Sequence, residues 1–208
     1  MPTCIGLTGN IATGKSTVAR ILVEWGAQHI DADHVAHEVL ASQGAAYRAV
    51  VDAFGERILV PGGEAIDRRV LGAIVFAAPA ALARLEALVH PAVIALVAQR
   101  IAASQAPVVV VEAIKLLESG LAADYAAIWA TTCSPTIQRE RLMSIRKLSR
   151  AAAEQRIAAQ SPQAEKLAQA DVVIQTGGSL AATRAQVQEA WSRFALADQT
   201  SEVSGSTA

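Results

Sequence analysis

The sequence predicts an α/β fold, a doubly wound and mostly parallel sheet of about five strands with helices on both faces. Short apolar segments typical of buried strands alternate with longer segments whose apolar residues recur at helical spacing. The clearest strand, residues 107–112, contains four consecutive valines, which indicates burial on both faces. With 208 residues, 52% of them hydrophobic, the chain is long enough for one core with insertions.

The first strand leads into the most specific motif of the chain. Residues 3–8 are short and mostly apolar, residues 9–16 read GNIATGKS, and residues 17–25 have helical periodicity. The motif matches the phosphate-binding loop G-x-x-x-x-G-K-[ST] in its required context of strand, loop and helix. Its glycines let the backbone approach a phosphate, Lys15 would reach the β- and γ-phosphates, and Ser16 would bind Mg²⁺. A chance glycine-rich turn is the alternative, and the flanking elements argue against it.

A long helical stretch follows a short second strand at residues 28–33. Asp67 is expected to cap a helix, and Pro91 to start or kink one. The expected helices cover residues 35–40, 45–54, 67–76 and 80–103, and a clear loop at residues 61–63 separates the second from the third.

The remaining chain continues the alternation with strands at 125–132 and 171–175 and helices at 136–160 and 179–194. We expect one domain over residues 1–197, with a core at 1–33, 106–135 and 161–197. We interpret residues 34–105 as a helical insertion able to cover a substrate, the expected substrate-binding segment, and residues 136–160 as an insertion able to act as a lid. Residues 198–208 are small and polar and are expected to be a disordered tail.

Bulk properties exclude several classes of protein. The net charge of −1 and the lack of a basic run argue against nucleic-acid binding by bulk electrostatics. No apolar run approaches the ~20 residues of a membrane span, and we see no signal peptide, so we expect a cytoplasmic protein without a membrane partner. Cys4 and Cys133 are expected to be buried free thiols rather than a disulfide.

Three carboxylates are candidates for chemistry. Asp31 and Asp33 end the second strand, at the sheet edge where α/β proteins bind ligands. Asp33 could accept the proton of an attacking hydroxyl or help to hold Mg²⁺; the alternative is a helix cap, and for Asp31 both remain open. Glu112 ends the valine strand, where it would lie near Mg²⁺, or it is simply an exposed strand terminus.

The segment 136–160 carries five arginines and one lysine against two glutamates. We favour a lid whose cations stabilise the transferring phosphate over a solvated helix face. His34, His37 and Glu38 do not have the spacing of a metal site, and we favour a plain helix face for them.

The motifs together resemble the dephospho-coenzyme A kinase family. Beside residues 6–17 and the segment IDAD at 30–33, the resemblance rests on the following in the same order: IDRR at 66–69 with LG at 71–72, LE at 85–86 before HP at 90–91, LLE at 116–118 before GL at 120–121, Gln138 with RL at 141–142, RIAAQ at 156–160, and KLA at 166–168 before AD at 170–171. The chain departs from the family at Asn10 in place of a second glycine, at residues 112–115, at Ile145 and at residues 175–176.

This resemblance implies phosphorylation of the ribose 3′-hydroxyl of dephospho-coenzyme A by ATP with Mg²⁺. It makes Asp33, Lys15 and Arg141 the catalytic residues, with Ser16 as the metal ligand. The implied substrate-binding residues are Thr8, Asp33, Arg68, Arg69, His90 and Glu112, and the implied nucleotide-binding residues are Gly9, Asn10, Ile11, Ala12, Thr13, Gly14, Lys15, Ser16, Thr17 and Arg146.

Two other functions remain as alternatives. One is a different small-molecule kinase, of the nucleoside monophosphate or shikimate type. The other is a nucleotide-gated switch, although the Asn-Lys-x-Asp pattern typical of guanine-specific switches is missing from the sequence. The expected partner is a small-molecule substrate, and the expected state is a monomer or weak homo-oligomer.

Overall fold

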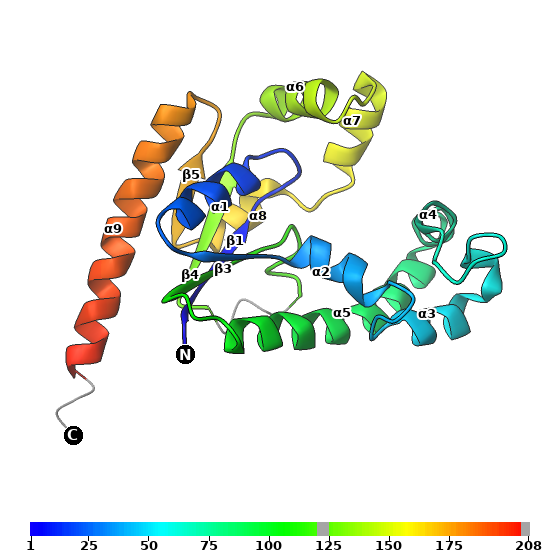
Figure 1. Ribbon diagram of the computed structural model, residues 1–208. Helices are drawn as coiled ribbons and strands as arrows, with labels where there is room; N and C mark the ends of the chain where they lie inside the picture. Colours follow the sequence, from blue (N-terminus) through cyan, green and yellow to red (C-terminus); the bar gives the residue numbers. More distant parts are fainter. Residues whose placement is uncertain (120–124, 205–208) are drawn as a thin grey trace. The chain divides into compact units, whose positions relative to one another are not determined.

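The sheet confirms the predicted fold class. The structure is a computed structural model and describes residues 1–119 and 125–204. In these residues five strands form one sheet in the order β2-β3-β1-β4-β5. Figure 1 labels β1, β3, β4 and β5 of this sheet. β1 pairs in parallel with β3 and β4, and β4 pairs in parallel with β5. The strands are β1 (Thr3–Thr8), β2 (Gln28–Asp31), β3 (Val108–Glu112), β4 (Ala127–Thr132) and β5 (Val172–Gln175).

The chain folds into two compact units. The first contains Met1–Pro2 and Ile30–Gln105, with α2 (Ala32–Val39), α3 (Tyr47–Phe54), a 3₁₀ turn (Glu56–Ile58), α4 (Arg68–Ala77) and α5 (Pro79–Ala102). The second contains Thr3–His29 and Ala106–Ala208. Its helices are α1 (Lys15–Glu24), α6 (Pro135–Ile145), α7 (Arg150–Ala158), α8 (Gln163–Ala168) and α9 (Leu180–Ser204).

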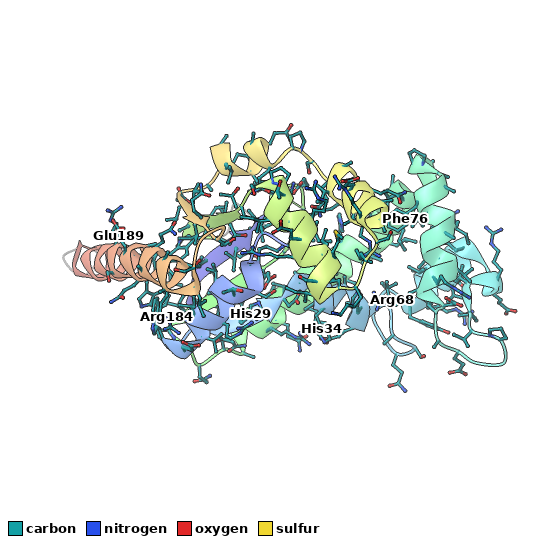
Figure 2. All side chains as sticks on the ribbon, turned by 90° about the horizontal axis from the view of Figure 1, so that it is seen from above. His29, His34, Arg68, Phe76, Arg184 and Glu189 are labelled. Carbon is teal, nitrogen blue, oxygen red and sulfur yellow. The ribbon has the colours of Figure 1, made fainter. Side chains whose placement is uncertain are left out.

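The hydrophobic core of the second unit lies between the sheet and helices α1 and α9. Alternate residues of β1, Ile5 and Leu7, are fully buried in this cluster together with Trp129 of β4. On the opposite face of β1, a Cβ at Gly6 would lie 2.6 Å from Leu116 Cδ2, so only glycine fits there. Arg184 of α9, labelled in Figure 2, lies 5.9 Å over the Trp25 ring and also pairs with Glu24.

The first unit contains a confirmed cap and two corrections. Asp67 caps α4 as predicted, since its Oδ1 accepts from the amides of Arg69 (2.9 Å) and Val70 (3.2 Å). α5 runs through Pro91, so this proline does not start a helix as expected, while the alternative expectation of a kink stays a prediction. By length and composition α5 could also cross a membrane, so the expectation that no apolar run approaches a span is wrong by that measure. This is weak evidence for a span, because core helices of other proteins pass the same test.

The second unit differs from the prediction in its helices. The expected helix at 136–160 is broken into α6 and α7 at Lys147, whose φ of +53° is left-handed, and Ser149 caps the second piece through the Ala152 amide at 3.2 Å. The sequence analysis did not predict α8. α9 continues to Ser204, beyond the predicted end and into the tail expected to be disordered from Asp198, because no glycine or proline occurs at 195–204. Residues 205–208 of that tail lie outside the described residues.

A buried lysine ties α8 to the loop after β3. Lys166 is 2% exposed, and its Nζ donates to Glu118 Oε1 (2.6 Å) and to the Ile114 carbonyl (2.9 Å). Ser161 Oγ donates to the same carboxylate oxygen at 2.7 Å. Burial alone would raise the pKa of Glu118, but the hydrogen bonds from Lys166 and Ser161 outweigh it and lower this pKa below its ordinary value.

This pKa shift predicts an acid-labile contribution to stability. A lowered carboxyl pKa stabilises the fold above the unfolded-state pKa, and the contribution is lost as the pH falls through the folded-state value. We expect Glu118→Gln to lower the melting temperature near neutral pH and to reduce its fall between about pH 5 and pH 3. Thermal melts across that range check this, with the exposed Glu165→Gln of α8 as the matched control. Parallel curves for Glu118→Gln and the control would contradict it.

Candidate active site

Carbonyl groups of the phosphate loop accept hydrogen bonds from side chains. Four consecutive carbonyls each accept a hydrogen bond from a side chain, and three of those donors come from distant segments of the second unit. Asn10 accepts from Thr13 Oγ1 (2.7 Å), Ile11 from Gln138 Nε2 (2.9 Å), Ala12 from Arg141 Nη1 (3.1 Å) and Thr13 from Thr176 Oγ1 (2.6 Å). Because the amides of Asn10 and Ile11 donate to side chains of residues 163 and 160, an anion-binding nest would be formed by the loop amides that follow them.

The two glycines of the motif are required by the backbone. Gly9 has φ +141°, and a Cβ there would lie 2.6 Å from the Thr131 carbonyl oxygen. Gly14 has φ +92°, and a Cβ there would lie 2.9 Å from Thr176 Oγ1. Gly14 immediately precedes α1, so the helix begins inside the loop and adds the positive end of its dipole to the site.

Lys15 and Ser16 occupy the first turn of α1. Lys15 is 7% exposed, and its Nζ donates to the Gly9 carbonyl at 3.0 Å, so the cation lies over the loop. The Ser16 hydroxyl donates to Glu112 Oε1 at 3.1 Å. Thr17 also lies in this turn, and its amide donates to the Gly14 carbonyl at 3.0 Å.

Glu112 is not an exposed strand terminus. It is 5% exposed, and its second oxygen lies 3.1 Å from Nε2 of His29, a residue of β2 that is labelled in Figure 2. A serine hydroxyl and a carboxylate together are oxygen donors of the kind that Mg²⁺ prefers. The described residues hold no group of three or more His, Cys, Asp or Glu that could bind a metal alone, so these two would need phosphate and water ligands beside them.

His29 is a residue that the sequence analysis missed. It lies in the second strand, which was expected only to carry Asp31 and Asp33. A histidine in a short strand has no spacing signal of its own, and its contact with Glu112 spans 83 residues. The parallel topology, which puts β2 next to β3, was the only available clue.

Arg141 supports the loop and the segment after β5. Its guanidinium donates to the Ala12 carbonyl, to Thr176 Oγ1 (3.1 Å) and to the Thr176 carbonyl (2.5 Å). Cys133 lies next to it at 3.7 Å. Burial raises the pKa of the Cys133 thiol and the Arg141 charge opposes this rise. Cys133 and Cys4 are both free thiols, and burial also raises the pKa of Cys4.

Two other predicted residues of the second unit lie apart from these contacts. Arg146 is exposed at the C-cap of α6. Thr8 is fully buried, and its hydroxyl donates to the Ile114 carbonyl at 3.3 Å. The Thr8 side chain therefore joins β1 to the loop after β3.

The first unit carries the other predicted residues. Asp31, not Asp33, caps α2, because its Oδ1 accepts from the His34 amide at 3.0 Å. Asp33 lies exposed in the first turn of the same helix. Arg69 is exposed in the first turn of α4, and His90 is half-buried within α5.

Arg68 contacts a histidine of the same unit. Its Nη2 lies 2.5 Å from His37 Nε2, an arrangement in which the neutral imidazole accepts (Arg68 and His34 are labelled in Figure 2). Burial, and then the Arg68 charge, lower the pKa of His37, which keeps the ring neutral. His34 lies 3.4 Å from Glu38 on the same helix.

The parallel sheet and the phosphate loop define the class of protein, a phosphate-loop nucleotide-binding protein. The sequence model of the dephospho-CoA kinase family matches residues 3–182. The chain therefore belongs to the dephospho-CoA kinase family, and its reaction class is that of an ATP-dependent kinase.

Individual relatives agree with this assignment. The dephospho-CoA kinase of Moorella thermoacetica is 46% identical over 90% of each chain. The solved dephospho-CoA kinase of Campylobacter jejuni aligns with a TM-score of 0.68 at 27% identity, over 95% of this chain and 100% of that one. A shikimate kinase of Bacteroides thetaiotaomicron aligns with a TM-score of 0.54 at 14% identity, over 92% of this chain and 98% of that one, which shows a shared fold alone.

Proposed function

We propose that this chain transfers the γ-phosphoryl group of ATP to the ribose 3′-hydroxyl of dephospho-coenzyme A, giving coenzyme A and ADP. The observation that carries the nucleotide half is the phosphate loop, whose carbonyls 10–13 accept hydrogen bonds from side chains and whose Gly9 carbonyl accepts from Lys15. The acceptor rests on membership of the family.

The loop and its neighbours would act mainly by positioning and by charge. Lys15 and the loop amides that follow Ile11 would bind the β- and γ-phosphates and stabilise the charge that develops on the transferring group. Ser16 and Glu112 would hold Mg²⁺, with His29 fixing the carboxylate. When bound, Mg²⁺ would neutralise phosphate charge and orient the γ-phosphate for in-line attack.

The acceptor side is assigned to the first unit. Asp33 would accept the proton of the 3′-hydroxyl or orient that hydroxyl, and its exposed position in the first turn of α2 supports this proposal. Arg68, Arg69 and His90 would bind anionic groups of the substrate. Residues 34–105 would then serve as the substrate-binding insertion, and residues 136–160 as a lid whose Arg146 is exposed toward solvent.

A coupled assay of ADP release tests the reaction. We expect ADP release with Mg-ATP to depend on added dephospho-coenzyme A, and the product to gain the mass of one phosphoryl group. ADP release that did not depend on this acceptor, or that appeared with shikimate or a nucleoside monophosphate instead, would overturn the proposed substrate.

A further inference from the structure

The segment just after the predicted lid contacts the start of the phosphate loop. Residues 160–163, here called the brace, accept three hydrogen bonds from the second and third residues of the motif. The Ile11 amide donates to Gln160 Oε1 (2.7 Å), the Asn10 amide to Gln163 Oε1 (2.9 Å), and Asn10 Nδ2 to the Ser161 carbonyl (3.0 Å). All of these residues belong to the second unit.

The brace is itself attached to the sheet. Gln163 Nε2 donates to the Thr131 carbonyl of β4 at 2.9 Å, so this one side chain bridges the loop and the strand beside it. Ser161 Oγ donates to Glu118, which also holds the buried Lys166 of α8. The brace therefore has fixed partners on the sheet side and can locate the loop relative to the sheet.

Ile11 is held from both ends of the lid. Its amide is bound by Gln160, which follows α7, and its carbonyl by Gln138, which lies in α6. The peptide groups before and after Ile11 are thus each bound by a side chain. One of these side chains comes from α6 and the other from the residues that follow α7. Ala12, the next residue, has φ +59°, a left-handed conformation that a free loop residue rarely adopts.

Asn10 makes the contact stronger in this chain than the motif requires. It is 6% exposed, and its Nδ2 bond to Ser161 exists because asparagine stands where the family usually has a second glycine. Its Oδ1 is buried without a hydrogen-bond partner, which costs stability. Asn10 thus has an unfavourable buried oxygen, while its amide and its Nδ2 both bind the brace. This combination indicates that the position of the loop relative to the brace matters.

We propose that Gln160 and Gln163 are positioning residues for nucleotide binding. By holding the amides of Ile11 and Asn10, they fix the first turn of the loop so that the following amides converge on the β-phosphate. The proposal rests on the proposed function only in that the loop binds nucleotide phosphates; it does not depend on the acceptor.

Two isosteric variants test it, Gln160→Met and Gln163→Met, since methionine has a similar length and no acceptor oxygen. Each should raise the Kd for ADP and the KM for ATP by about five- to tenfold, the loss expected for one hydrogen bond, with the KM for the acceptor unchanged. The matched control is Gln169→Met, because Gln169 is exposed at the C-cap of α8 and its side chain donates to the Glu165 carbonyl at 3.1 Å.

ADP binding by calorimetry and the melting temperature separate positioning from stability. A merely structural role would lower the melting temperature and the active fraction while leaving the Kd for ADP at the control value, and this result would overturn the proposal. If a methionine variant did not fold, Gln160→Asn keeps the amide but cannot reach Ile11, and the same shift in Kd is expected. ADP binding is measured without the acceptor. If the enzyme failed to phosphorylate dephospho-coenzyme A, that result would therefore contradict the proposed function and leave the role of Gln160 and Gln163 in ADP binding untouched.

Discussion

Replacing Lys15 by alanine is expected to lower kcat by about two to three orders of magnitude or more while the protein stays folded. Lys15 lies over the phosphate loop, with its Nζ 3.0 Å from the Gly9 carbonyl, and phosphoryl transfer depends mostly on charge placed where negative charge develops. The measurement is steady-state kcat together with the melting temperature of the variant.

Two further variants make this result specific. Arg20→Ala removes an exposed cation from the same helix and should leave kcat near the parent value. Lys15→Arg keeps the charge but changes its shape and reach, and it should recover only a small part of the rate, since a guanidinium does not replace an ammonium in a tight loop. A Lys15→Ala enzyme with a near-normal rate would remove the loop from the mechanism.

Much of this site could be predicted because its signals are local. The loop is a contiguous motif between a strand and a helix, and residues 9–16 determine both its glycine conformations and the position of Lys15. The valine run of β3 likewise predicts its own burial, since every residue of that strand is buried. Topology then places Glu112 beside the loop, because Leu7 of β1 is in register with it.

The residues that were missed act over long sequence separations. Gln160 and Gln163 contact the loop across 149 and 153 residues, and a single glutamine carries no pattern that indicates its partner. His29 is a similar case. The break between α6 and α7 depends on Lys147, whose backbone is left-handed. Lysine has no preference for this conformation, so the sequence does not predict the break. Helical periodicity alone therefore merged two helices into one.

Asp33→Asn is expected to lower kcat by about two to four orders of magnitude and to leave ATP affinity unchanged. Asparagine is close in size to aspartate but cannot accept a proton, so a loss confined to turnover points to the acceptor hydroxyl. Asp33 lies exposed in the first turn of α2, and the cap of that helix is Asp31, so the substitution should hardly change the melting temperature.

The matched control for this prediction is Asp31→Ala. Because Asp31 accepts from the His34 amide, its loss should lower the stability by about 0.5–2 kcal/mol, which the melting temperature would register. The two variants should therefore separate, one in kcat and the other in melting temperature, although the residues are only two positions apart. If Asp33→Asn lowered the melting temperature and kept kcat, the carboxylate would have a structural role, and the base would have to be sought elsewhere in the chain.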